Sequence, residues 1–153
     1  MKKALSIIIA ITVLLTACKK EYITENPVQI DSEGVTICTN SASFIADVTI
    51  PDHTELEPGE TFTKTWRVEN TGTCIWNEDY RLAFALNSQM GAPDFLPLKV
   101  VNPGEEFDIS VKLTAPEGEG SYRADFHLLD PDDEVITIND GQYLWAIITV
   151  NEP

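Results

Sequence analysis

The stretch FDISVKL at residues 107–113 alternates apolar and polar side chains without interruption. The stretch YRADFHL at residues 122–128 does the same. In a β-strand successive side chains point to opposite faces, so a period of two is typical of a strand that buries one face. Both stretches therefore predict half-buried strands.

The same pattern predicts four more strands, at residues 44–50, 61–68, 80–86 and 143–150. In the last of these the core face stays open, because Leu144, Ile148 and Val150 compete for it with Trp145 and Ile147. Turn-forming clusters separate the strands: Pro58-Gly59, Asn70-Thr71-Gly72, Pro103-Gly104, Glu117–Gly120, Pro131–Asp133 and Asn139–Gly141. No window shows a sustained helical stripe. The fold class expected is all-β, an immunoglobulin-like antiparallel β-sandwich of about seven strands with a tyrosine corner at Tyr122.

The amino terminus carries an export signal. Lys2 and Lys3 precede a short apolar run, and the residues Leu15-Thr16-Ala17-Cys18 follow it. These four residues closely resemble the lipobox of bacterial lipoproteins, which implies cleavage after residue 17 and lipid attachment at Cys18. The expected localisation is the cell envelope, on the extracytoplasmic side, with the chain lipid-anchored to a membrane.

The sequence divides into residues 1–17 as a lipoprotein signal peptide, 18–36 as a lipid-anchored flexible tether and 37–153 as the sandwich. Loss of Lys2 and Lys3 from the 10 basic residues leaves 8 against 25 acidic ones, a formal charge of −17. Nucleic-acid binding requires a basic surface that releases counterions, so that class of partner is excluded.

Once Cys18 carries lipid, Cys38 and Cys74 are the two thiols that remain. An exported protein lies where disulfides persist, so we expect a bridge between them, with two free buried cysteines as the alternative. Closing a loop of about 36 residues contributes roughly 3–4 kcal/mol in the entropic model.

Residues 44–52 (FIADVTIPD) and 57–76 (EPGETFTKTWRVENTGTCIW) resemble the four-tryptophan (FW) domain. This is the Ig-like central domain of the Next-to-breast-cancer-one autophagy receptors, and it also occurs widely in bacterial exported proteins. Shorter matches at residues 80–82, 90–91, 101–105, 108–111, 122–123 and 145 extend the likeness from about Cys38 to Val150. The resemblance implies an Ig-like fold and a non-enzymatic role in recruiting protein partners.

Three of the family's four tryptophans fall at Trp66, Trp76 and Trp145, and Phe126 occupies the remaining position. Trp66 alternates with polar residues on a strand and is expected to pack across the two sheets. Trp76 follows a polar turn, where an aromatic ring either caps the core or presents a stacking face to a ligand. Trp76, Tyr80 and Tyr143 are therefore the candidate ligand contacts.

Catalytic and metal-binding residues are not predicted, and neither is a cofactor. His53 and His127 lack partners at metal-ligand spacing, and His127 is expected to be a solvated strand residue. The carboxylates of residues 130–134 lack the alternating spacing of a calcium loop, so a hairpin turn is preferred over a calcium site. No nucleophile-elbow or phosphate-loop motif is present.

The function expected is a non-catalytic, lipid-anchored envelope module that recognises a protein or peptide partner. Two alternatives stay open: a carbohydrate-binding module for cell-wall or extracellular glycan, and an accessory subunit of an enzyme. An extended peptide paired with a free sheet edge suits the first function, provided that an edge is uncovered.

Overall fold

The computed structural model describes residues 29–30, 36–139, 141 and 143–151, and these residues form β-strands and loops without a helix. Among them there is accordingly no helix with the length and hydrophobicity needed to cross a membrane. Ten strands follow in chain order: β1 Gln29–Ile30, β2 Thr36–Ile37, β3 Ala42–Asp47, β4 Thr54–Leu56, β5 Thr61–Asn70, β6 Arg81–Asn87, β7 Phe95–Pro97, β8 Glu106–Thr114, β9 Gly120–Leu129 and β10 Leu144–Val150.

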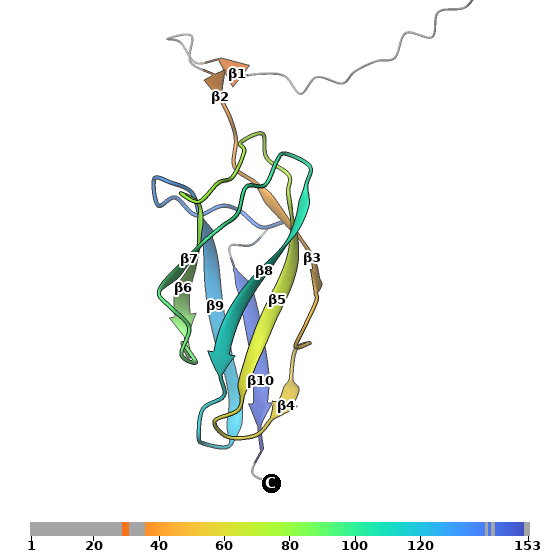
Figure 1. The fold of residues 1–153 in the computed structure, drawn as a ribbon, viewed down its shortest axis with the longest axis vertical. Coiled ribbons are helices and arrows are strands. Elements are labelled where there is room, and N and C mark those ends of the chain that lie inside the picture. Colours follow the sequence, from red (N-terminus) through yellow and green to blue (C-terminus); the bar gives the residue numbers. More distant parts are fainter. Residues whose placement is uncertain (1–28, 31–35, 140, 142, 152–153) are drawn as a thin grey trace, which may run out of the picture.

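Eight of the strands form two sheets that pack face to face (Figure 1). The larger sheet has the order β4-β10-β9-β6-β7, and the smaller one has the order β3-β5-β8. All neighbours are antiparallel except β4 and β10, which are parallel. The predicted Ig-like sandwich is confirmed, with two three-residue strands, β4 and β7, that the alternation did not predict.

Strands β1 and β2 lie apart from the sandwich and pair only with each other, through Gln29↔Ile37 and Ile30↔Thr36 (Figure 1). Strand β1 lies within the expected tether, and β2 lies at its junction with the domain. The described part of that segment thus contains one short paired element, which its unpatterned composition did not predict.

The burial of the long strands follows their period of two. In β8 the residues Ile109, Val111 and Leu113 are buried, whereas the alternate residues 108, 110 and 112 are exposed. In β9 the buried set includes Phe126 and Leu128. The pattern is broken at Leu86 of β6, which is exposed beside a register shift between residues 84 and 86, and at Thr65 of β5 and Asp125 of β9, which are buried although they alternate with core residues. The apolar rows of the two sheets therefore build one core between them.

The structure shows which face of β10 is turned to the core, a point that the sequence leaves open. Leu144, Ala146, Ile148 and Val150 are all buried, and Trp145 is 40 % exposed. The face that carries Leu144 therefore belongs to the core, and the face that carries Trp145 is the outer face of the larger sheet.

Two local features close the ends of the sandwich. The hydroxyl of Tyr122 donates to the main-chain oxygen of Gly118 at 3.0 Å, which confirms the tyrosine corner. Gly72 lies so close to the segment before β3 that an added Cβ would approach the oxygen of Thr39 to 2.3 Å. Only glycine fits at that turn without a shift of the neighbouring main chain.

Candidate functional site

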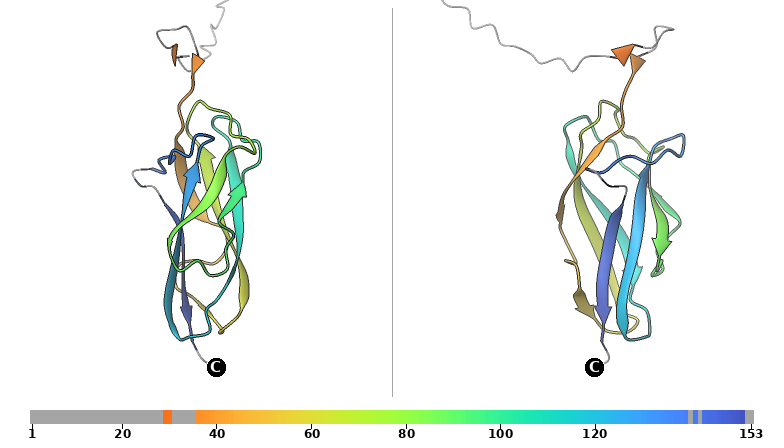
Figure 2. Two further views of the ribbon diagram at one scale, coloured as in Figure 1. Left: turned by 90° about the vertical axis from the view of Figure 1, so that its left-hand side faces the viewer. Right: turned by 180° about the vertical axis from the view of Figure 1, so that it is seen from behind.

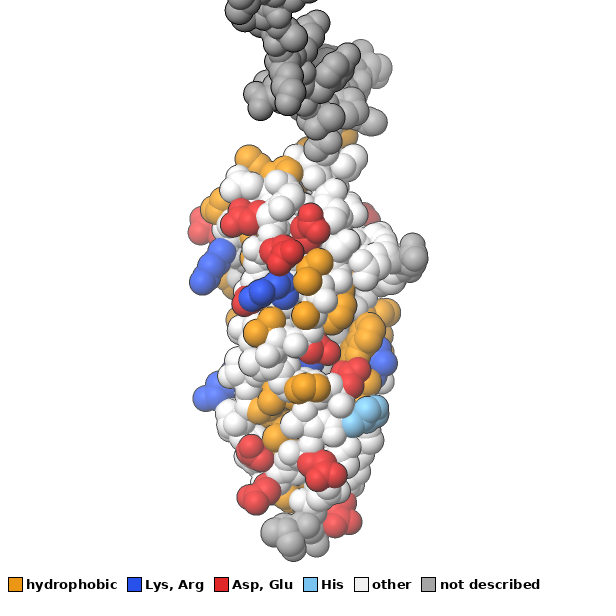
Figure 3. Space-filling model, turned by 90° about the vertical axis from the view of Figure 1, so that its right-hand side faces the viewer, with side chains coloured by type: hydrophobic (Ala, Val, Ile, Leu, Met, Phe, Trp, Pro, Cys, Tyr) orange, Lys and Arg blue, Asp and Glu red, His pale blue; other side chains and the backbone are white. Residues whose placement is uncertain are grey.

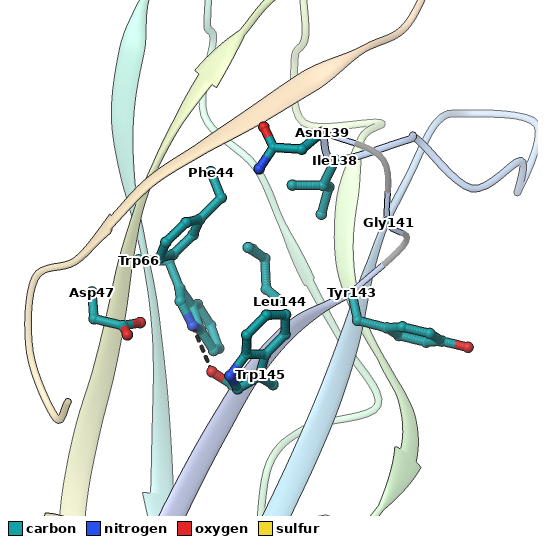
Figure 4. A pocket seen from close by; sticks show the side chains of 9 residues that line it. All are labelled: Phe44, Asp47, Trp66, Ile138, Asn139, Gly141, Tyr143, Leu144 and Trp145. Carbon is teal, nitrogen blue, oxygen red and sulfur yellow. Dashed lines mark hydrogen bonds between the residues drawn. The ribbon is translucent and has the colours of Figure 1, made fainter. Parts of the chain in front are cut away.

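A cleft opens at the side of the sandwich between β3 of the smaller sheet and β10 of the larger one (Figure 4). We call it the β3–β10 cleft. It holds a cavity of about 190 Å³. Its lining residues are Phe44, Asp47, Trp66, Ile138, Asn139, Gly141, Tyr143, Leu144 and Trp145.

The cleft exists because the larger sheet is incomplete at this edge. Strand β4 pairs only with Ile148–Val150, so residues 144–147 of β10 have a strand neighbour, β9, on one side alone. Figure 2 shows β10 from behind, with the short β4 beside only its C-terminal end. The upper end of the cleft is closed by Ala42, which donates to the oxygen of Thr137 at 2.9 Å and accepts from the main chain of Asn139 at 2.9 Å.

The floor of the cleft is apolar and rigidly held. Trp66 is 1 % exposed, and its indole Nε1 donates to the main-chain oxygen of Trp145 at 2.8 Å. Its ring packs against Phe126 with 5.5 Å between centroids. Leu144 and Ile138 complete the floor. Trp66 thus packs across the two sheets as predicted, and Phe126 keeps the core at the position where the family has its other tryptophan.

A buried ion pair lies at one end of the cleft. The Nζ atom of Lys64 is 2.7 Å from Oδ1 of Asp47 and donates to the oxygen of Ile50 at 2.6 Å. Lys64 is fully buried and stacks over the Trp66 ring at 5.8 Å, whereas the Asp47 side chain is 27 % exposed. A buried cation requires such partners, because desolvation of an unpaired charge is costly. Asp47 therefore neutralises the charge of Lys64 and also lines the cleft.

Trp145 forms the outer wall of the cleft. Its Nε1 donates to Oδ2 of Asp52 at 3.1 Å, and the guanidinium of Arg123 lies 5.1 Å from its ring centroid. Arg123 in turn pairs with Asp125 at 2.5 Å, and this contact raises the pKa of the guanidinium. Trp145 is thereby fixed in orientation although it is partly exposed.

The candidate contact Tyr143 lies at the rim, and its side chain points away from the cavity (Figure 4). Its ring packs on His127 with 4.5 Å between centroids. His127 is half-buried, and within the described structure its buried Nε2 has no hydrogen-bond partner. Burial lowers the pKa of His127, and the charge of Asp125 offsets this in part. His127 lies on the outer face as expected but is only partly solvated, because the Tyr143 ring packs on it.

The other two candidate contacts, Trp76 and Tyr80, are inside the protein. Trp76 is 0 % exposed, and its main chain exchanges two 3.0 Å hydrogen bonds with Val101. Its ring stacks on Tyr80 and meets Phe107 edge-on. Burial raises the pKa of Tyr80, whose hydroxyl donates to Asn40 at 3.2 Å. Neither residue is placed to contact a ligand, and Trp76 is the member of the tryptophan set that caps the core.

The predicted disulfide joins Cys38 to Cys74, with 4.8 Å between their Cα atoms. It links the segment before β3 to the loop that precedes Trp76, at the end of the sandwich where the chain enters. The disulfide prediction is confirmed, and the bridge lies apart from the residues that line the β3–β10 cleft. Cys18 and residues 1–17 lie outside the described residues.

The acidic loop at residues 130–134 is built as a turn. Oδ1 of Asp130 accepts the N–H groups of Asp132 and Glu134, both at 3.0 Å, and Oδ2 accepts from Asn40 at 3.1 Å. Asp133 pairs with Arg81. No group of three or more His, Cys, Asp or Glu side chains within the described ranges is arranged to hold a metal ion. The hydrogen bonds of Asp130 hold the loop together, in agreement with the predicted hairpin turn.

The face that carries the β3–β10 cleft shows hydrophobic side chains interspersed with acidic ones (Figure 3). Phe44, Ile45 and Val48 are 38 %, 42 % and 45 % exposed along and just after β3. The sequence alone did not identify Phe44, Asp47 or Leu144 as members of a site. Their proximity depends on how the two sheets meet, and no local motif encodes it.

Comparisons with known proteins agree with this architecture. The sequence model of the Ig-like domain from next to BRCA1 gene matches residues 49–150. Protein ILRUN of Danio rerio is 32 % identical over 122 residues, which cover 80 % of this chain and 42 % of that protein. Next to BRCA1 gene 1 protein of Mus musculus is 33 % identical over 116 residues, covering 74 % of this chain and 11 % of that protein.

Protein JOKA2 of Solanum tuberosum is 30 % identical over 112 residues, covering 71 % of this chain and 12 % of that protein. Among solved structures, the CARDB domain of a Pyrococcus furiosus protein aligns with a TM-score of 0.47 at 15 % identity, covering 74 % of this chain and 94 % of that one. The chain spans less than half the length of the curated relatives it matches. With the family model matching two thirds of it, the chain belongs to the family of the Ig-like domain from next to BRCA1 gene.

Proposed function

We propose that the chain is a non-catalytic recognition module that binds a protein or peptide partner in the β3–β10 cleft and is held on the cell envelope by lipid at Cys18. The observation that carries the binding role is the cavity of about 190 Å³, floored by Trp66 and Leu144 and bordered by the half-buried carboxylate of Asp47. A mostly apolar concavity with a few polar groups at its margin is the usual form of a binding site.

The chemistry of the cleft supports binding rather than catalysis. Its lining is aromatic, aliphatic or amide apart from Asp47 and the phenol of Tyr143, which points away from the cavity. One oxygen of Asp47 is already engaged by Lys64. General acid–base catalysis needs a group within hydrogen-bond reach of the reacting atom and with a suitable pKa, and the cleft offers no matched pair.

Attachment to the envelope rests on the sequence Leu15-Thr16-Ala17-Cys18 and on its likeness to a lipobox. The disulfide between Cys38 and Cys74 supports export, because such bonds persist in oxidising compartments. The test is membrane fractionation of cells that express the full chain with Cys18→Ser, with Cys38→Ser as the matched control. Loss from the membrane fraction in Cys18→Ser alone supports the anchor, and equal retention of both variants contradicts it.

The binding role is tested by affinity capture from envelope extracts with the full chain and two matched alanine variants. Phe44 lies on edge strand β3 beside the cleft, whereas Phe95 lies on edge strand β7 and is 62 % exposed. A partner retained by Phe95→Ala and lost from Phe44→Ala supports the proposal. A partner captured equally by both variants places its site elsewhere and contradicts the role of the cleft.

A glycan is the second candidate ligand, because the partly exposed Trp145 lies beside Arg123 on the outer face of the larger sheet, and Tyr143 packs on His127 nearby in the sequence. Aromatic rings beside hydrogen-bonding groups are suited to stacking on a sugar. A glycan array probed with the full chain and with Trp145→Ala tests this. A glycan that binds the chain and not the variant would replace the peptide as the favoured ligand.

A further inference from the structure

We propose that the occupant of the β3–β10 cleft is an extended peptide segment whose apolar side chain enters the cavity over Trp66 while an adjacent Lys or Arg pairs with Asp47. This inference rests on the proposed function and specifies the chemistry of the partner.

The main chain of the segment pairs with β3 rather than with β10. On β10 the oxygen of Trp145 already accepts from Trp66, and the oxygen of Ile147 accepts from the main chain of His53 at 2.9 Å. The main-chain oxygens of β10 that point toward the cleft, those of Trp145 and Ile147, therefore already accept hydrogen bonds. A peptide strand would find fewer free acceptors on β10.

Strand β3 offers a better edge. It is the outermost strand of its sheet and pairs with β5 on one side. Ala42 uses its outer main-chain groups to bond residues 137 and 139. Because these groups repeat every second residue along a strand, Phe44 presents its own to the same side. A peptide strand on β3 would continue the pairing that residues 137–139 begin.

The size of the cavity argues for a single side chain. Pockets for whole small ligands measure about 300–1,000 Å³. The cavity of about 190 Å³ is smaller, and Trp66, Leu144 and Ile138 at its floor are all less than 5 % exposed. Such a floor contacts one aliphatic or aromatic side chain, and its burial supplies most of the affinity.

The charge of the chain argues for a cation beside that side chain. Asp47 uses Oδ1 for Lys64, and among the described residues its second oxygen has no hydrogen-bond partner, so it can accept a further donor. Four cations, Lys64, Arg67, Arg81 and Arg123, are each paired with an aspartate. With a formal charge of −15, the surface attracts a basic partner and repels a second copy of itself.

The experiment selects peptides and then changes them singly. A random seven-residue phage-display library is panned on the immobilised full chain, and the best binder is synthesised for calorimetry. We expect the enriched peptides to place Lys or Arg next to an apolar residue. Replacing that Lys or Arg by Gln should weaken binding about tenfold, the effect of losing one charge-assisted hydrogen bond. This change is made in the peptide, so it does not affect folding of the protein.

Protein variants then locate the contacts. Phe44→Ala should weaken binding about tenfold, and Phe95→Ala should leave it within about twofold. Asp47→Asn should abolish the preference for Lys or Arg over Gln, whereas Asp108→Asn, which breaks the exposed pair with Arg67, should preserve it. If Asp47→Asn unfolds because Lys64 loses its partner, two other results still test the inference. These are the change of Lys or Arg to Gln in the peptide, and the comparison of Phe44→Ala with Phe95→Ala.

The inference is overturned if no peptide is enriched, if enriched peptides lack the basic and apolar pair, or if the Gln peptide binds equally well. These results would leave the proposed function intact as long as Phe44→Ala still loses a protein partner in the capture experiment. Capture that is indifferent to Phe44→Ala would overturn the function as well.

Discussion

The indole Nε1 of Trp66 donates a 2.8 Å hydrogen bond to the main-chain oxygen of Trp145, and this bond joins the two sheets at the floor of the β3–β10 cleft. Trp66 belongs to β5 of the smaller sheet and Trp145 to β10 of the larger one. One tryptophan of the family set thus satisfies an edge carbonyl of the strand that carries another. The arrangement fills the side of the sandwich where β4 is too short to cover β10.

Replacement of Trp66 by Phe should destabilise the protein by about 1–3 kcal/mol, because it leaves the part-buried main-chain oxygen of Trp145 without its donor. The free energy of unfolding in urea measures this. Trp145→Phe is the matched control: its bond to Asp52 is exposed, so we expect a loss below about 1 kcal/mol. An equal loss in the two variants would contradict the role assigned to the Trp66 indole.

Truncation of Trp76 to Ala should cost about 3–5 kcal/mol, because the side chain is fully buried between Tyr80 and Phe107. Its neighbour Ile75 is 57 % exposed, and Ile75→Ala should stay within about 0.5 kcal/mol of the parent protein. Thermal or urea unfolding distinguishes the two. Unchanged stability of Trp76→Ala would contradict the assigned burial of Trp76 and would make it a candidate ligand contact again.

Reduction of the disulfide between Cys38 and Cys74 should lower the free energy of unfolding by roughly 3–4 kcal/mol, the entropic value for a loop of 36 residues. The measurement is unfolding with and without dithiothreitol. A double variant with Cys38→Ala and Cys74→Ala should be indifferent to the reductant. An unchanged midpoint for the reduced parent protein would show that the bridge adds no stability.

Stability should fall as the pH drops below about 6.5, the ordinary pKa of histidine. Burial holds the pKa of His127 below that value in the folded state. Between the two pKa values the unfolded chain binds more protons, so stability rises with pH in this window and is lost on acidification. The check is the difference in unfolding between the parent protein and His127→Gln from pH 7.5 to 5. The variant should lose part of the slope, and identical profiles would contradict the prediction.

The period of two in residues 107–113 and 122–128 predicted β8, β9 and the fold class correctly, because each strand buries one face. Strands β4 and β7 were missed, since three residues are too few for alternation to be distinguishable from chance. The core face of β10 could not be assigned from sequence, because Leu144 and Trp145 are both apolar. The structure assigns it through the contacts that hold Trp145 outside, to Asp52 and Arg123.

The burial of Trp76 could not be predicted from the sequence either. A tryptophan after a polar turn is compatible with exposure, and only its pairing with Val101 brings it inside. The β3–β10 cleft was missed for a related reason: Asp47 and Leu144 are distant in the chain, and their proximity depends on how the sheets are stacked. The disulfide could be predicted because its chemistry depends on the compartment and on the number of free thiols.

The most direct test of the central claim is photo-cross-linking in intact cells with p-benzoylphenylalanine in place of Phe44 in the full chain, and with the same residue in place of Phe95 as the control. Both positions are exposed on edge strands, and only Phe44 borders the cleft. We predict a discrete cross-linked protein from position 44 and none from position 95. Cross-links of equal yield from both positions, or from position 95 alone, would contradict the account.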